Sequence, residues 1–309
     1  MPSNLTEERA ERLAWTSVLP RAEPLAGAAV KEYAAAAGAS ERDLRKQVLL
    51  HLPRFTPAEI ERPDCVRAET ERLGERLRAR RLPYDDWAGH SRIERLETKS
   101  LRFGPVDDRV ARVVHERFHY IGTFRAGRHL GLFLPGSANV PLALLTLSPM
   151  DLTNLAEMFP SQDDRDRVRV LSRLFAFDYA PRNTMSYLMG QARKWLRAEL
   201  PQVGTLLTYL NPNLEFTGAS YQASNWRPLL EVPARYAYLH GDYITFRSLM
   251  GLAPLKRAAV RYSQYRLQPL KLLRDELHRN TAPRPIAARR AAIPYLAGGT
   301  ADAVLLHRR

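Results

Sequence analysis

The stretch VRVLSRLFAFDYAPRNTMSYLMGQARKWLRAELPQVGTLLTYL, residues 168–210, decides the fold. Its first part, Val168 to Tyr179, is a short apolar run that ends in turn residues, which predicts a strand. Asn183 to Leu200 then repeats apolar residues every three or four positions, as in a helix with one buried face. Val203 to Leu210 predicts a second strand. A strand, a helix and a strand in this order indicate an α/β core.

The neighbouring sequence extends this core in both directions. Upstream, 106–119 predicts a helix, 129–134 and 140–147 a hairpin of two strands, and 151–158 a short helix. Downstream, 236–246 predicts a further strand. We therefore expect an α/β (α+β) fold in which a mixed central sheet is flanked by helices.

Three regions follow from the composition of the chain. Residues 1–100 are rich in Ala, Glu, Arg and Leu and predict a helical accessory region, with prolines such as Pro20, Pro24 and Pro53 as breaks. Residues 101–250 hold the core, and 251–309 form a basic C-terminal extension. The helix-turn-helix pattern in 26–52 could read DNA, but its low net positive charge favours a helical cap.

Charge is unevenly distributed along the chain. The net charge is +14, and the last 79 residues hold 14 Lys and Arg against 5 Asp and Glu. Such a local excess attracts polyanions, although an ordinary solvated surface is the alternative. Basic residues alternate with Tyr262 and Tyr265 in 256–271, which predicts nucleic-acid contacts; core contacts of these two tyrosines in a terminal helix or strand are the equal alternative. The residues expected to make them are Lys256, Arg257, Arg261, Arg266 and Lys271.

Several classes of protein are not favoured by the sequence. The start of the chain is polar and acidic, and no apolar run approaches the ~20 residues that a membrane span needs. The single Cys65 has no spaced partners, which predicts a reducing compartment, the cytoplasm, and no metal site. We also find no nucleophile elbow, phosphate-binding P-loop or zinc-protease motif.

The segment from Arg173 to Leu188 leads from a strand into a helix. Asn183 or Thr184 can cap that helix, whose first N–H groups are then free to bind an anion or an oxyanion. A plain turn with an ordinary cap is the alternative. The segment is therefore a candidate site for a donor phosphate or a polarised carbonyl.

A second segment, 207–226, carries a resemblance to a known family. Tyr221-Gln222-Ala223-Ser224-Asn225-Trp226, preceded by Thr217-Gly218, resembles the G-x-x-Y-Q-A-x-N-W signature of Mom-like proteins, a divergent branch of the GNAT acyltransferase superfamily. Three more motifs occur upstream in the same order. They are the "N-x-x-S" helix start at Asn183–Ser186, the "R-L" strand at Arg173-Leu174, and the "H-Y-x-G" entry at His119–Gly122.

The resemblance covers about 115–230 and implies a GNAT-like fold. It also implies chemistry, because the Mom group is thought to add a glycinamide-like group to adenine. The chain departs from the family pattern at Asn211, where an Asp is typical; an amide can orient a ligand but cannot act as a base. The usual pyrophosphate loop for acyl-CoA is missing from 182–190, so we expect no cofactor, with acyl-CoA possible but unsupported.

The expected activity is the transfer of an acyl or aminoacyl group, such as glycyl, from aminoacyl-tRNA to an amine acceptor that could be a small metabolite. The alternatives are a Mom-like enzyme that modifies adenine in DNA and a nucleic-acid-binding protein without catalysis. We assign catalysis to Ser186, Tyr120, Tyr221 and Asn211. Donor or phosphate binding is assigned to Arg173, Arg182, Asn183, Thr184 and Tyr187, and substrate positioning to His119, Gln222, Asn225 and Trp226.

Overall fold

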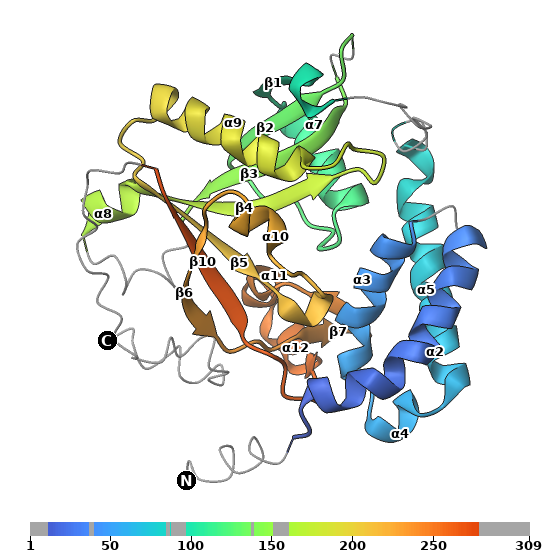
Figure 1. Cartoon of the computed structure of the whole chain (residues 1–309). Helices are drawn as coiled ribbons and strands as arrows, with labels where there is room; N and C mark the ends of the chain where they lie inside the picture. The colour runs from blue at the N-terminus through green and yellow to red at the C-terminus, as the bar shows by residue number, and fades with distance from the viewer. Residues whose placement is uncertain are drawn as a thin grey trace.

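A seven-stranded sheet forms the centre of the molecule (Figure 1). The computed structural model describes residues 12–36, 40–84, 87, 97–136, 139–150 and 161–277. The strands lie in the order β1-β2-β3-β4-β5-β10-β6, and all neighbours are antiparallel except β4 and β5. They are β1 (Arg102–Pro105), β2 (Arg128–Phe133), β3 (Pro141–Pro149), β4 (Val168–Ala176), β5 (Thr205–Leu210), β6 (Arg227–Val232) and β10 (Leu270–Glu276). The expected mixed central sheet is confirmed.

Helices cover both faces of this sheet. Helix α9 (Thr184–Glu199) crosses one face and buries Leu188, Met189, Ala192 and Leu196 against β2 and β3. On the other face, α7 (Asp108–Val113) and the π-helical turn Val114–Phe118 pack on β3 and β4. The apolar spacing in α9 is thus the cause of its position, because one stripe of the helix meets the sheet. The predicted helix 151–158 lies outside the described residues.

The N-terminal helices form a layer at one end of the sheet, at the right of Figure 1. They are α2 (Trp15–Ala36), α3 (Glu41–His51), α4 (Pro57–Ile60) and α5 (Pro63–Arg81). Their core is shared with a second, three-stranded sheet of β7 (Ala237–Leu239), β8 (Asp242–Ile244) and β9 (Arg261–Tyr262) through Tyr236, Tyr238 and Tyr265. The helices are therefore a cap that is packed onto the core, and α3 is buried in that packing.

Two expectations from the sequence need correction. The β10 strand lies between β5 and β6, so the core does not end at 250 but includes Glu276. Helix α2 also continues through Pro20 and Pro24, because burial of its alanine-rich face outweighs the backbone bonds that proline removes.

The remaining short elements are α8 (Gln162–Asp166), α10 (Ala219–Gln222), α11 (Phe246–Met250), α12 (Pro254–Ala258) and the 3₁₀ turns at 52–54, 82–84, 98–100 and 212–214.

Length and hydropathy distinguish the helices of the described residues from a membrane span. None of them is both long and apolar enough to cross a bilayer.

Candidate functional site

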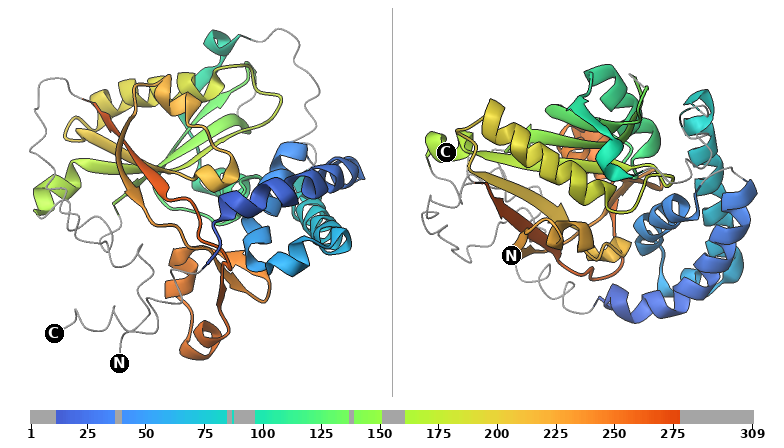
Figure 2. Two further views of the ribbon diagram at one scale, coloured as in Figure 1. Left: turned by 60° about the horizontal axis from the view of Figure 1, so that its bottom comes forward. Right: turned by 45° about the horizontal axis from the view of Figure 1, so that its top comes forward.

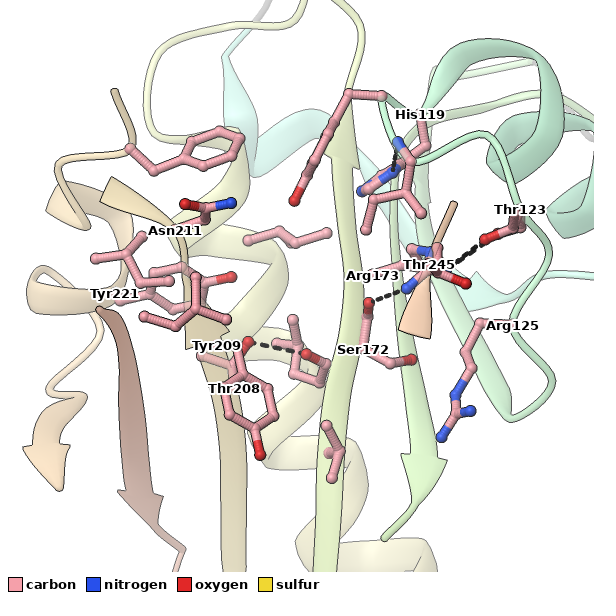
Figure 3. Close-up of a pocket in the computed structure, with 18 of the residues that line it drawn as sticks. His119, Thr123, Arg125, Ser172, Arg173, Thr208, Tyr209, Asn211, Tyr221 and Thr245 are labelled. Atoms are coloured by element: carbon pink, nitrogen blue, oxygen red, sulfur yellow. Dashed lines mark hydrogen bonds between the residues drawn. The ribbon is translucent and has the colours of Figure 1, made fainter. Parts of the chain in front are cut away.

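A cleft opens where the two parallel strands separate. The strands β4 and β5 are paired only from Val168 to Val170, opposite Thr205 to Leu207. Beyond this point the hydroxyl of Thr208 donates to the carbonyl of Leu171 at 2.9 Å, which is the last tie before the strands diverge. The cleft has a volume of about 590 Å³, within the range of small-molecule sites. Figure 3 shows the side chains that converge on it.

The loop that follows α7 supplies one wall of this cleft, and residues 215–221 and 243–248 supply others. Helix α3 fixes two of these walls. The side-chain amide of Gln47 donates to the carbonyl of Tyr120 at 2.7 Å, and His51 Nε2 accepts from the N–H of Tyr243 at 3.2 Å. The N-terminal helices are thus part of the structure that holds the cleft open.

Arg173 is the main charged group in the cleft. Its guanidinium donates to the carbonyl of Ser172 at 2.7 Å and to both the carbonyl and the hydroxyl of Thr123 at 3.2 and 3.1 Å (Figure 3). Its Nε has no partner, and within the described part of the chain no carboxylate pairs with it. Burial lowers the pKa of Arg173. A desolvated cation without a counter-ion is costly, so this position favours a ligand with negative charge.

His119 supplies a neutral donor beside Arg173. Its Nδ1 accepts from the N–H of Ile121 at 3.2 Å, so the neutral ring carries its proton on Nε2. Burial keeps the pKa of His119 well below its ordinary value of 6.5. The ring stacks on Tyr120 with centroids 4.6 Å apart. At neutral pH His119 can therefore donate a hydrogen bond into the cleft and cannot act there as a cation.

Tyr209 lines the cleft, and three further phenols there, those of Tyr120, Tyr221 and Tyr243, complete this set of donors. Burial raises the pKa of each, to about 12 for Tyr243, so they remain protonated. Among the residues that line the cleft, the carboxylate of Glu215 is held by Arg45 at 2.7 and 2.5 Å. The cleft thus offers donors of hydrogen bonds and a positive charge, which suits a developing oxyanion.

The start of α9 forms a smaller pocket of about 380 Å³ next to the cleft. The two share Arg42, Met185, Ala219 and Ser220, so the helix start and the end of β5 belong to one continuous hollow. Asn183 has a left-handed backbone (φ 64°) and makes no side-chain cap. The N–H groups of Met185 and Ser186 have no partner within the described residues. These two amides can bind a phosphate. Arg42 lies beside them and pairs with Asp178, which lines the same pocket, at 3.6 Å.

The structure brings together some of the residues expected from the sequence. Arg173, His119, Tyr120, Asn211 and Tyr221 line the cleft. The side chain of Asn211 is engaged: its amide donates to the Tyr236 hydroxyl at 2.7 Å, and its oxygen accepts from the backbone N–H of Asn213 at 3.1 Å.

Other expected residues lie at the smaller pocket or outside both. Asn183, Thr184 and Ser186 line the smaller pocket, where the Ser186 hydroxyl donates to the carbonyl of Asn183 at 3.0 Å. Trp226 is 5% exposed and packs against Tyr221. The residues that line neither hollow are Arg182, Tyr187, Gln222, Asn225 and Trp226.

Sequence reasoning missed Arg42, Thr123, Thr208, Tyr243 and Thr245, which also line the cleft. Arg42, Thr123, Tyr243 and Thr245 lie outside the motifs, in the cap, a loop, the second sheet and the start of α11, and Thr208 lies on β5 upstream of the Tyr221–Trp226 motif. Within the described residues, no group of three or more His, Cys, Asp or Glu could hold a metal ion.

Comparison with known proteins places the chain in a family. The model of the Mom protein family matches residues 100–280. No curated protein matches the chain.

Three solved structures show distant likenesses. A candidate acetyltransferase from Salmonella typhimurium, solved with its cofactor acetyl-CoA, is 9% identical, with a TM-score of 0.37, covering 60% of this chain and 99% of its own. A candidate phosphinothricin N-acetyltransferase is 12% identical, with a TM-score of 0.34, covering 58% and 99%. Malonyl-CoA decarboxylase from Rhodopseudomonas palustris is 14% identical, with a TM-score of 0.25, covering 54% and 44%.

The expectation of no cofactor needs correction. The finding against it is that the first of these structures contains acetyl-CoA as its cofactor. The pocket at Met185 and Ser186 has the donors that a phosphate group needs.

Proposed function

The chain belongs to the Mom protein family, and from this premise we propose that it is a transferase that modifies an exocyclic amine of a nucleobase in DNA. The observation that carries the proposal is Arg173 in the cleft between β4 and β5, a partly buried guanidinium with which no carboxylate of the described residues pairs. Around it stand neutral donors from His119 and three tyrosines. Such a site stabilises negative charge on an oxygen of the reacting group.

The reaction that suits this set of donors is acyl-type transfer. The amine nitrogen attacks a carbonyl carbon, a C–N bond forms, and the carbonyl electrons move onto the oxygen. Arg173 and the Nε2–H of His119 stabilise that oxyanion. The oxyanion then collapses, the bond to the leaving group breaks, and the proton of the amine leaves with the departing thiolate or alkoxide.

The donor would lie across the two hollows. A thioester of coenzyme A and the ester at the end of a charged tRNA both supply an electrophilic carbonyl and a leaving group, and both carry phosphate. The free amides of Met185 and Ser186, with Arg42, would hold that phosphate. Met185 also lines the larger cleft, so the carbonyl would reach Arg173 from this side.

A nucleobase suits the acceptor side of the cleft. Tyr120 and Phe216, whose ring centroids are 5.5 Å apart, form an aromatic corner, and Tyr243 adds a third ring to the wall. Enzymes that act on a base within a duplex extrude it and stack it against aromatic side chains. A small metabolic amine would need neither these rings nor the basic segment that follows β8.

The experiment is to express the chain in a bacterial host and to analyse the host DNA, digested to nucleosides, by mass spectrometry. We expect a new nucleoside of increased mass. Arg173→Met should reduce its amount by about 100-fold or more, the usual effect of losing an oxyanion donor. The matched control is Arg169→Met: Arg169 lies on the same strand and donates to the carbonyls of Asp166 and Val168, but lies outside the cleft.

Two outcomes would contradict the proposal. If host DNA stays unmodified while purified protein transfers acyl groups to small amines, the acceptor is not a base in DNA. If the Arg173→Met variant, shown to be folded by its thermal transition, keeps full activity, then the cleft is not the site. Feeding isotope-labelled glycine or acetate would identify which donor supplies the added group.

A further inference from the structure

The segment that follows β8 is strongly basic and contains no acid. From Tyr243 to Arg274 there is no Asp or Glu, and the first acidic residue beyond it is Asp275. The cations are Arg247, Lys256, Arg257, Arg261, Arg266, Lys271 and Arg274. This surface therefore complements a polyanion.

Part of the same segment exposes apolar side chains to water. The described residues expose five large hydrophobic side chains, and three of them, Phe246, Met250 and Leu255, lie on α11 and α12. Leu255 is 89% exposed and directly precedes Lys256. Single exposed leucines are common on protein surfaces, but three apolar side chains within one short acid-free arm indicate a binding function.

Hydrogen bonds within the arm formed by α11 and α12 join its two helices. Arg257 donates to the carbonyls of Met250 and Leu252 at 3.2 and 3.1 Å, which joins the end of α11 to α12. The Thr245 hydroxyl caps α11 by accepting from the N–H of Ser248 at 3.2 Å. Because the backbone is fixed in this way, the exposure of Leu255 follows from the fold of the arm.

The arm begins at the mouth of the cleft. Thr245, Phe246, Arg247 and Ser248 all line it, and Thr245 is among the lining side chains labelled in Figure 3. From there α11 and α12 project away from the central sheet, at the bottom of the left view in Figure 2. One end of the arm thus borders the reaction site, and the other carries the exposed Leu255.

We propose that this arm is a wedge for duplex DNA, in which Leu255 enters the base stack as the target base leaves it, while Lys256 and Arg261 contact phosphates. The proposal rests on the function proposed above. Apolar side chains of this kind occupy the space that an unstacked base vacates, and they reduce the cost of opening the duplex. Phe246, on the same arm, lines the cleft and could contact the extruded base there.

The test compares duplex and single-stranded DNA of one sequence. Leu255→Ala should lower modification of the duplex at least tenfold and leave modification of the single strand unchanged, because a single strand needs no opening. The control is Leu82→Ala, since Leu82 is 61% exposed and lies at the end of α5. Loss on both substrates, or no loss on the duplex, would overturn the wedge.

A binding measurement separates failure of the wedge from failure of the proposed function. With 2-aminopurine in the duplex, wild-type protein should raise the fluorescence by unstacking the base, and Leu255→Ala should not, whether or not a base is modified. Lys256→Ala and Arg261→Ala should each reduce the slope of log affinity against log salt by about one. If wild-type protein leaves the fluorescence unchanged, or binds anionic vesicles instead of DNA through Leu255, the proposal is wrong.

Discussion

His51 links the stability of the chain to pH in a way that can be tested directly. The ring is 3% exposed; its Nδ1 donates to the carbonyl of Gln47 at 2.8 Å, and its Nε2 accepts from Tyr243. Burial lowers the pKa of His51 from 6.5 to about 4. Between pH 6.5 and about 4 the unfolded chain binds a proton at His51 and the folded chain does not. The free energy of unfolding that is present above pH 6.5 is therefore lost as the pH falls through this range.

The magnitude follows from the two pKa values. One unit corresponds to 1.36 kcal/mol, so lowering the pH from about 7.5 to about 5 should cost about 2 kcal/mol through His51 alone. His51→Gln removes the titration and keeps an amide that can replace both hydrogen bonds. The variant should therefore lose about 2 kcal/mol less stability than wild-type protein over this interval.

The assay is urea unfolding, followed by tryptophan fluorescence, at both pH values. A control variant, His240→Gln, changes a histidine whose side chain is exposed and should behave as wild type. Equal losses for His51→Gln and wild type would refute the reasoning. Such a result would mean that the pKa of His51 is the same in the folded and the unfolded chain.

Two further changes test the sheet. Asp275 is 2% exposed, and burial raises the pKa of its carboxyl to about 6. The folded state is therefore destabilised as the pH rises through this range and the carboxyl ionises. Asp275→Asn should add up to about 3 kcal/mol to the free energy of unfolding above pH ~6 and nothing below pH ~4, measured by urea unfolding. At Gly127, φ is 159° and a Cβ would overlap the carbonyl of Leu147, so Gly127→Ala should lower the free energy of unfolding by about 3 kcal/mol. Gly136 has open space around it, and Gly136→Ala should lower it by only about 1 kcal/mol. Thermal unfolding of the two variants compares these losses.

Much of the core could be predicted from sequence because its signals are local. The apolar spacing in α9 and the short apolar runs of β3 and β4 each predict an element without reference to the rest of the chain. The position of β10 could not be predicted, since pairing with β5 and β6 depends on contacts between residues far apart in sequence. For the same reason the proline rule failed in α2, where burial decides the outcome.

The candidate site divides in the same way. Arg173, His119, Tyr120 and Tyr221 stand in collinear motifs, and the fold brings them to one cleft. Arg42 and Tyr243 come from the cap and the second sheet, and only the packing of α3 shows that they belong to the site. Tyr265, for which the sequence allowed either base stacking or a core contact, is 2% exposed and packs on Trp15.

The late entry of β10 has a consequence for biosynthesis. When a ribosome releases β5 and β6, the place between them is still vacant, and two strand edges stay exposed until residues 270–276 emerge. Unpaired edges invite association with other chains, and contacts over long sequence separation form slowly. The nascent protein should therefore depend on chaperones during this interval, and any premature stop before 270 would leave an aggregation-prone product.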